Sequence, residues 1–290
     1  MGLEIILGKT AGFCYGVTRA INGAREELET NDKKIYCLGE IVHNKNVIDD
    51  LSKNGLNFIE NIEDAKGKTI IRAHGVTKEV YEKAKEKNIE LKDLTCPKVL
   101  KIHDIAEKYT ELGYYIILIG SEKHPEVIGI KSFCLDESSY IVNDEEDIQN
   151  VVSNIKDSKN KKILIIAQTT YNSKKFDNIV EIFKENLNTE EYELKVIKTI
   201  CPATEMRQKE TEEIAKEVDY MIIIGDKKSS NTNKLYEISS KYCKETIFIN
   251  NSDELDTSNI NGKEKVGIMA GASTPKENIE LVFEKLIFMK

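Results

Sequence analysis

Short apolar runs of strand length alternate with longer segments of helical periodicity along the whole chain. The runs 114–119 (YYIILI), 162–167 (KILIIA) and 220–224 (YMIII) have the length and aliphatic content of buried parallel strands. The segments 77–87 (TKEVYEKAKEK) and 230–242 (SNTNKLYEISSKY) place apolar residues at helical spacing. This alternation predicts an α/β fold built from small parallel sheets.

Polar loops rich in functional side chains follow these apolar runs. Six such loops contain His43, His74, His124 with Glu126, Thr169 with Thr170, Ser229 to Asn231, and Ser273 with Thr274. Ligands bind beyond the carboxyl ends of the strands in open α/β sheets. We therefore expect these loops at the functional edge of each sheet.

The cysteines fall into two groups by their surroundings. The chain has six, without the close spacing of a zinc motif and without a secretion signal, so a disulfide framework is not expected. Three lie among aromatic or aliphatic residues, where a free thiol behaves as a small apolar side chain. Cys37, Cys134 and Cys243 are therefore predicted core residues.

The other three cysteines, Cys14, Cys96 and Cys201, each follow an extended segment and open an amphipathic helix. Pro97 and Pro202 support the two later helix starts, because proline at the first helical position loses no hydrogen bond. A helix N-terminus lowers the pKa of a thiol and favours the thiolate that binds metal or attacks a substrate. These three cysteines are the candidate ligands.

The motifs repeat three times. Each helix-start cysteine is followed after 28 or 29 residues by one polar loop, and after a further 31 to 45 residues by a second. We therefore predict three small parallel α/β units, 13–95, 96–193 and 194–290, the last completed by the N-terminal strand within 1–12. If the units meet about a pseudo-threefold axis as a trefoil, the cysteines and polar loops converge on one central cavity.

Composition narrows the class of protein. The 290 residues carry 42 Lys and Arg against 50 Asp and Glu, a net charge of −8, which argues against nucleic-acid binding through a global basic face. No apolar run approaches the length of a membrane span, and the N-terminus lacks a signal peptide. We therefore expect a cytoplasmic protein that binds neither nucleic acid nor membrane.

Three thiolates at one point suggest a cubane iron–sulfur cluster in which one iron lacks a protein thiolate. Such an iron can take a substrate oxygen as a Lewis acid. Zinc with three protein ligands and one open position is the competing interpretation, and the spacing of the ligands does not decide between them.

The polar loops indicate an anionic substrate. Side-chain donors together with helix N-termini make a site for phosphate or diphosphate. Glu126 is the acid that stands out among these loops, and a buried carboxyl group with a raised pKa is a ready general acid, with Thr169 placed to pass or orient a proton. His103, in the middle of a helix, is expected to be a surface or capping residue.

These motifs together resemble a known family. GFCYGV, EIVHN, AHGV, TCPKV, HPEVIG, QTT, CPATEMRQ, SSNTN and AGAST are similar to the LytB/IspH family of 4-hydroxy-3-methylbut-2-enyl diphosphate reductases and occur in family order over nearly the whole chain. The family performs the last step of the non-mevalonate isoprenoid route, an iron–sulfur oxidoreductase reaction.

The resemblance implies a role for each motif. It implies a [4Fe-4S] cluster held by Cys14, Cys96 and Cys201, and Glu126 assisted by Thr169 as the proton source. It implies that the substrate's diphosphate binds the histidines and hydroxyl or amide side chains of the polar loops: His43, His74, His124, Ser229, Ser230, Asn231 and Ser273. The implied reaction consumes two external electrons, from a donor such as ferredoxin or flavodoxin, and yields isopentenyl and dimethylallyl diphosphate.

Two other interpretations compete with this one. A non-redox iron–sulfur dehydratase or synthase resembling quinolinate synthase is also a three-unit, three-cysteine protein, but it binds carboxylates. Arginines should then outnumber histidines in the loops, whereas Arg72 alone lies among the strand-end loops beside three histidines. A cluster-bearing redox sensor would need a DNA-binding or partner-binding module, and the three units leave no room for one.

Overall fold

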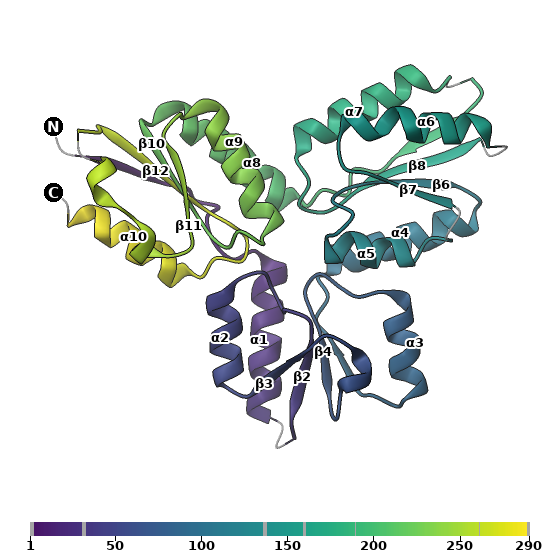
Figure 1. Ribbon diagram of the computed structural model, residues 1–290, viewed down its shortest axis with the longest axis horizontal. Helices are drawn as coiled ribbons and strands as arrows, with labels where there is room; N and C mark the ends of the chain where they lie inside the picture. The colour runs from purple at the N-terminus through teal and green to yellow at the C-terminus, as the bar shows by residue number, and fades with distance from the viewer. Residues whose placement is uncertain are drawn as a thin grey trace. The chain divides into compact units, whose positions relative to one another are not determined.

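The computed structural model describes residues 3–30, 33–135, 138–158, 161–188, 190–260 and 262–288. The strands in these ranges form three four-stranded sheets in which every pairing is parallel. Figure 1 shows the helices that flank the sheets. The prediction of an α/β protein with three small parallel sheets is confirmed. Contacts divide the chain into a first unit, Met1–Thr18, Val42–Lys53 and Pro202–Lys290, and a second unit, Arg19–Ile41 and Asn54–Cys201.

One sheet of the second unit has the strand order β3-β2-β4-β5. Its strands are β2 (Ile35–Leu38), β3 (Leu56–Ile59), β4 (Thr69–Ile71) and β5 (Leu91–Asp93). Every residue of β2 and β4 is buried, which is the pattern of central strands covered on both faces. The helices nearest in sequence are α1 (Tyr15–Thr30), α2 (Lys45–Lys53) and α3 (Lys78–Glu86).

The other sheet of the second unit has the order β7-β6-β8-β9. Its strands are β6 (Tyr115–Ile119), β7 (Ser139–Val142), β8 (Lys162–Ala167) and β9 (Glu193–Val196), and its helices are α4 (Pro97–Glu111), α5 (Pro125–Ser132), α6 (Ile148–Asp157) and α7 (Ser173–Asn186). Alternate residues of β6 serve two cores: Ile116 packs with α4 and α5, and Ile117 with α6 and α7. The sheet is therefore covered on both faces (Figure 1).

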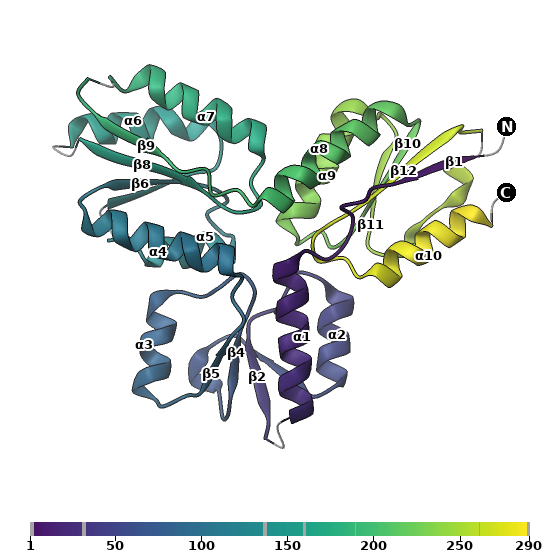
Figure 2. The ribbon, with the colours of Figure 1, turned by 180° about the vertical axis from the view of Figure 1, so that it is seen from behind.

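The sheet of the first unit has the order β1-β12-β10-β11. Its strands are β1 (Glu4–Leu7), β10 (Tyr220–Ile224), β11 (Thr246–Ile249) and β12 (Lys265–Ala270), and its helices are α8 (Pro202–Glu217), α9 (Ser230–Tyr242) and α10 (Lys276–Ile287). Figure 2 shows β1 beside β12. The two strands pair in parallel, with Glu4 opposite Lys265. The apolar cores place α8 and α9 on one face of this sheet and α10 on the other.

The three sheets share one internal plan. Read from one edge to the other, their orders are β3-β2-β4-β5, β7-β6-β8-β9 and β11-β10-β12-β1. In each sheet the two central strands lead into the two polar loops, and an edge strand leads into a cysteine. Because the strands are parallel, their carboxyl ends lie at the same end of the sheet. The fold thus brings the two loops and one cysteine of each sheet to the same end of that sheet, where the strands have their carboxyl ends.

The grouping of motifs by sheet differs from their grouping along the sequence. Along the sequence each repeat begins with a cysteine and continues with two loops, whereas each sheet carries the two loops of one repeat and the cysteine that opens the next, with Cys14 belonging to the sheet of β10 and β12. Strand β9 also runs to Val196, three residues past the expected boundary at 193, and pairs with β8. The division of the chain into three domains stays a prediction.

Among the residues that the structure describes, no helix is long and apolar enough to cross a membrane.

Candidate active site

The three candidate ligand cysteines occupy equivalent positions in their sheets. Cys14, Cys96 and Cys201 follow the edge strands β1, β5 and β9 and directly precede or begin the turn into α1, α4 and α8. Each cysteine donates its backbone N–H to a carbonyl in the neighbouring polar loop: to Ala272 at 3.1 Å, Ala73 at 3.0 Å and Thr169 at 3.0 Å, respectively. One equivalent backbone hydrogen bond therefore ties each cysteine to the loop beside it.

The two groups of cysteines also differ in exposure. The three candidate ligands are partly exposed, whereas Cys37, Cys134 and Cys243 are buried, as predicted. Burial raises the pKa of Cys37 to about 12 and that of Cys134 to about 11, so that both thiols stay protonated. A protonated, inaccessible thiol is a poor metal ligand. Only the first group has the accessibility and location that ligation requires.

The site's general-acid candidate, Glu126, is 2% exposed at the start of α5. Thr169, in the loop after β8, donates its backbone N–H to Oε1 at 2.6 Å and its hydroxyl to Oε2 at 2.8 Å. Burial raises the pKa of Glu126 to about 7, against the lowering effect of these two hydrogen bonds. The carboxyl group is therefore poised to hold and release a proton at neutral pH.

Two of the candidate histidines meet in the second unit. The rings of His74, after β4, and His124, after β6, lie edge to face with centroids 5.4 Å apart. His124 is the N-cap of α5, and its Nδ1 accepts the backbone N–H of Glu126 at 3.1 Å. An accepting nitrogen carries no proton, so a neutral His124 carries its proton on Nε2. The cap thus orients this ring as a donor through Nε2.

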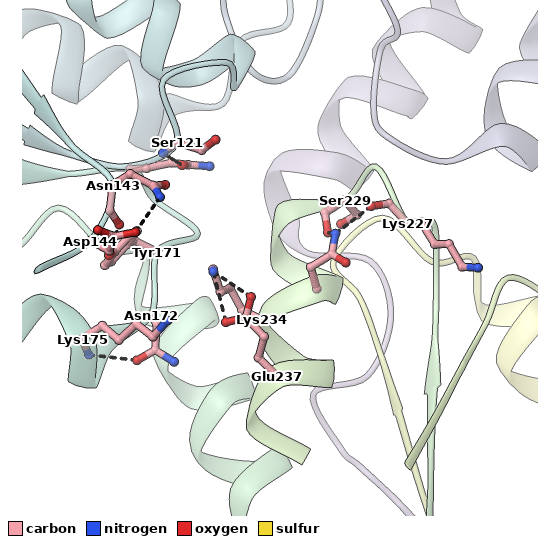
Figure 3. Close-up of polar contacts among 12 residues, drawn as sticks. Ser121, Asn143, Asp144, Tyr171, Asn172, Lys175, Lys227, Ser229, Lys234 and Glu237 are labelled. Atoms are coloured by element: carbon pink, nitrogen blue, oxygen red, sulfur yellow. Dashed lines mark hydrogen bonds and ion pairs between the residues drawn. The ribbon is translucent and has the colours of Figure 1, made fainter. Parts of the chain in front are cut away.

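The serine and asparagine candidates lie in the first unit. Ser229 is the N-cap of α9 and accepts the backbone N–H of Thr232, and Figure 3 shows it at the helix start. Ser230 is the first residue of that helix, and Asn231 is 3% exposed. Neither side-chain polar atom of Asn231 has a hydrogen-bond partner among the described residues. A buried amide of this kind at a helix N-terminus suits an anionic ligand.

Ser273, in the loop after β12, is tied to His43. Its hydroxyl donates to the backbone carbonyl of His43 at 2.9 Å, and the residue is buried. Within each unit the structure thus places the predicted residues at strand ends and helix starts. The convergence of all twelve residues on one cavity stays a prediction.

His103 is not the surface or capping residue that the sequence suggested. It is 3% exposed in α4, its ring stacks on Phe133 at 4.3 Å, and neither ring nitrogen has a hydrogen-bond partner among the described residues. Burial lowers its pKa to about 4, so the ring is neutral at physiological pH. The residue lies on the face of α4 that packs on α5. The sequence around His103 does not indicate this burial, because it depends on contact with a second helix.

Sequence reasoning also missed three charged residues beside the cysteine loops. Arg207 and Glu210 of α8 bond the backbone before Cys14, and Arg19 of α1 bonds the backbone before Cys96. The two arginines stand five and six residues after a candidate ligand cysteine. This similar distance from a cysteine in two of the three repeats is the sequence signal that could have identified the two arginines.

These features define a class of protein, an α/β protein whose three parallel sheets each present a partly exposed thiol after an edge strand. A buried glutamate with a nearly neutral pKa and polar helix starts lie in the loops of the same strand ends. The sequence matches the model of the LytB protein family over residues 5–287, and the chain belongs to that family.

Curated relatives agree with the family model. The chain is 43% identical to the 4-hydroxy-3-methylbut-2-enyl diphosphate reductase of Thermoanaerobacter sp. (strain X514), over 99% of this chain and 98% of that protein. It is 40% identical to the reductase of the same name from Clostridioides difficile (strain 630), over 97% of this chain and 98% of the relative.

Solved structures are similar over the same extent. The reductase structure from Plasmodium falciparum superimposes with a TM-score of 0.90 at 31% identity, covering 98% of this chain and 88% of the other. A second structure, of (E)-4-hydroxy-3-methyl-but-2-enyl diphosphate reductase, described as the terminal enzyme of the non-mevalonate pathway, has a TM-score of 0.69 at 37% identity, covering 99% and 100%. Family and fold therefore agree.

Proposed function

We propose that the chain reduces 4-hydroxy-3-methylbut-2-enyl diphosphate to isopentenyl and dimethylallyl diphosphate, the last step of the non-mevalonate isoprenoid pathway. The observation that carries the proposal is the buried Glu126–Thr169 pair in a member of the LytB family, because the reaction must protonate a hydroxyl that leaves as water. Two electrons and two protons enter per turnover. One proton leaves with the hydroxyl oxygen as water and the other is added to carbon.

Cys14, Cys96 and Cys201 are the residues that would hold a [4Fe-4S] cluster. Their donor set fits this group: three partly exposed thiols in equivalent loops, each directly before a helix. When bound, the cluster supplies electrons and a Lewis-acidic iron without a protein thiolate. Zinc, the alternative metal for three such ligands, supplies no electrons and so does not suit a reductive reaction.

The diphosphate is assigned to the donors of the polar loops. His74 and His124 offer ring N–H groups in the second unit, and the start of α9 offers backbone N–H groups beside Ser229, Ser230 and Asn231 in the first. His43 and Ser273 extend this donor set. Hydrogen-bond donors and a helix N-terminus compensate the phosphate charge without any basic patch, which accommodates an anion on a chain of net charge −8.

Glu126 is assigned as the proton donor to the leaving hydroxyl. Its pKa near 7 keeps a proton available at neutral pH, and the N–H of Thr169 fixes one carboxyl oxygen. The Thr169 hydroxyl bonds the other oxygen and can exchange its roles as donor and acceptor when the carboxyl changes protonation. The pair therefore holds the proton in place and tolerates its transfer. A ferredoxin or flavodoxin is proposed as the electron donor.

Family membership decides against the two competing interpretations. Three units with three cysteines are compatible with a dehydratase or synthase resembling quinolinate synthase, and three cluster ligands with a redox sensor, whereas the family match extends over residues 5–287.

The test is anaerobic turnover by the reconstituted full-length chain. With dithionite and methyl viologen as reductants, the wild-type protein should convert the allylic alcohol diphosphate to both products, quantified by mass spectrometry. Glu126→Gln should still bind substrate, but its kcat should fall by roughly a hundredfold or more, because general-acid catalysis contributes about that much.

The matched control is Glu122→Gln, since Glu122 is an exposed glutamate four residues earlier. It should leave turnover unchanged. Full turnover by the Glu126→Gln protein would refute the proton-donor role, and no product from wild-type protein with an intact cluster would refute the proposed reaction.

A further inference from the structure

The backbone that leads to Cys14 is held by two charged residues of α8. Arg207, 4% exposed, donates from Nε to the carbonyl of Thr10 at 2.8 Å and from Nη2 to that of Gly12 at 2.9 Å. One turn later, Glu210 accepts the backbone N–H of Lys9 at 2.7 Å and that of Thr10 at 2.8 Å. Donors and acceptors of the segment between β1 and Cys14 are thus both occupied by side chains of one helix.

The backbone that leads to Cys96 is held in a similar way. Arg19 of α1 donates from Nη1 to the carbonyl of Thr95 at 3.0 Å and from Nη2 to that of Asp93 at 3.4 Å. The Asp93 carboxylate in turn accepts the N–H of Thr95 and the hydroxyl of Tyr81, both at 2.9 Å. A guanidinium again spans two carbonyl groups of the segment between an edge strand and a cysteine.

The two arginines occupy matching places in the repeated fold. Each lies in the second turn of its helix and bonds the segment after the edge strand of a sheet, β1 for Arg207 and β5 for Arg19. In the remaining sheet the segment before Cys201 is held by Thr199, whose hydroxyl donates to the carbonyl of Ala167 and accepts its N–H at 2.8 Å. An edge strand has a neighbour on one side only, so such segments depend on side chains for their position.

We propose that Arg207 and Arg19 are positioning residues for cluster ligation, with Arg207 fixing Cys14 and Arg19 fixing Cys96. The proposal rests on the proposed function, because it takes these cysteines to be cluster ligands. A guanidinium has several donors in one rigid plane, so it can fix two carbonyl groups at once, which a lysine cannot do. Preformed loops keep the thiols near the ligating geometry and reduce the ordering that binding the cluster would otherwise require.

The test compares Arg207→Met with Arg19→Met in the full-length chain. Amide hydrogen exchange of the metal-free protein, read by mass spectrometry, should rise about tenfold in residues 9–14 for Arg207→Met and in residues 93–96 for Arg19→Met, each without change at the other site. In the cluster-loaded protein, both substitutions should speed the loss of iron to a chelator several-fold. In this crossed pattern each substitution raises exchange only in its own segment, whereas a general loss of stability would raise exchange in both segments.

The matched controls lie on the same two helices. Arg25→Met on α1 and Lys209→Met on α8 replace exposed cations and should alter neither exchange nor iron loss. Arg207→Lys, which keeps the charge, should restore part of the protection at residues 9–14, and it serves as the test variant if Arg207→Met does not fold.

Three results would overturn the inference: equal exchange at both segments, exchange unchanged at either, or a crossed pattern with iron retained as in the wild type. Failure of the proposed function is read separately, from a wild-type chain that binds no cluster or forms no product.

Discussion

The protonation of Glu126 makes the stability of the metal-free chain depend on pH in a specific way. The carboxyl group is buried with a folded pKa of about 7, against an ordinary value of 4.5. Between these values the folded chain binds this proton and the unfolded chain does not. The free energy of unfolding therefore receives its full contribution from this group below pH 4.5 and loses it as the pH rises to about 7.

Glu126→Gln removes this titration while keeping the local hydrogen bonds. The glutamine oxygen can accept the Thr169 N–H, and its NH₂ can donate to the Thr169 hydroxyl. The difference between 4.5 and about 7, at about 1.4 kcal/mol for each pH unit, amounts to about 3 kcal/mol. As the pH rises from 4.5 to 7, the free energy of unfolding of the variant should therefore increase by up to about that amount relative to that of the wild type. Above pH 7 this difference should stay constant.

The assay is urea unfolding of the reduced, metal-free chain across this pH range, with the free energy obtained by linear extrapolation. Infrared spectroscopy of the folded protein supplies a direct check, because a protonated carboxyl band absent from the variant should titrate near pH 7 in the wild type. Glu122→Gln, an exposed change, should follow the wild-type curve. Parallel pH dependence of wild type and Glu126→Gln would refute the assignment of a buried, protonated carboxyl.

Three further predictions concern the cysteines, His103 and Gly75. Cys96→Ser should abolish cluster retention, measured as iron and sulfide per chain, whereas Cys134→Ser, at a buried position, should retain both; equal losses would remove the distinction between the two groups. His103→Leu should flatten the fall in unfolding free energy between pH 6.5 and 4, because the wild-type ring resists protonation only when folded; an unchanged acid profile would contradict its burial. Gly75→Ala should lower the unfolding free energy more than Gly55→Ala: both glycines have positive φ, but an added Cβ at Gly75 would lie 3.0 Å from His103 and at Gly55 would contact nothing within 4 Å. Equal losses in urea unfolding would show that backbone strain alone matters there.

Local pattern was sufficient for much of the architecture. The aliphatic runs around 116–119 and 163–167 become fully buried central strands, and the prolines after Cys96 and Cys201 stand at the first position of α4 and α8. Both follow from steric and solvation preferences that act within a few residues. The separation of partly exposed from buried cysteines was predictable for the same reason, because each depends on its immediate neighbours.

Contacts between distant segments were beyond the sequence pattern. Glu126 and Thr169 are 43 residues apart, and Arg207 lies 197 residues from Thr10. Such pairs depend on the order in which strands assemble, and periodicity along the chain carries no information about that order. The burial of His103 against Phe133 is of the same kind, since it requires α4 and α5 to pack together.

The sequence by itself determined the α/β class, the three candidate ligand cysteines and the family resemblance, because these rest on residue types and spacings that short segments carry. Only the tertiary structure decided that each cysteine follows an edge strand and is tied to the polar loop beside it, and that Glu126 is buried deeply enough to hold a proton near pH 7. The physical reason is that strand order and burial arise from packing among segments far apart in the chain, and burial is what shifts a pKa.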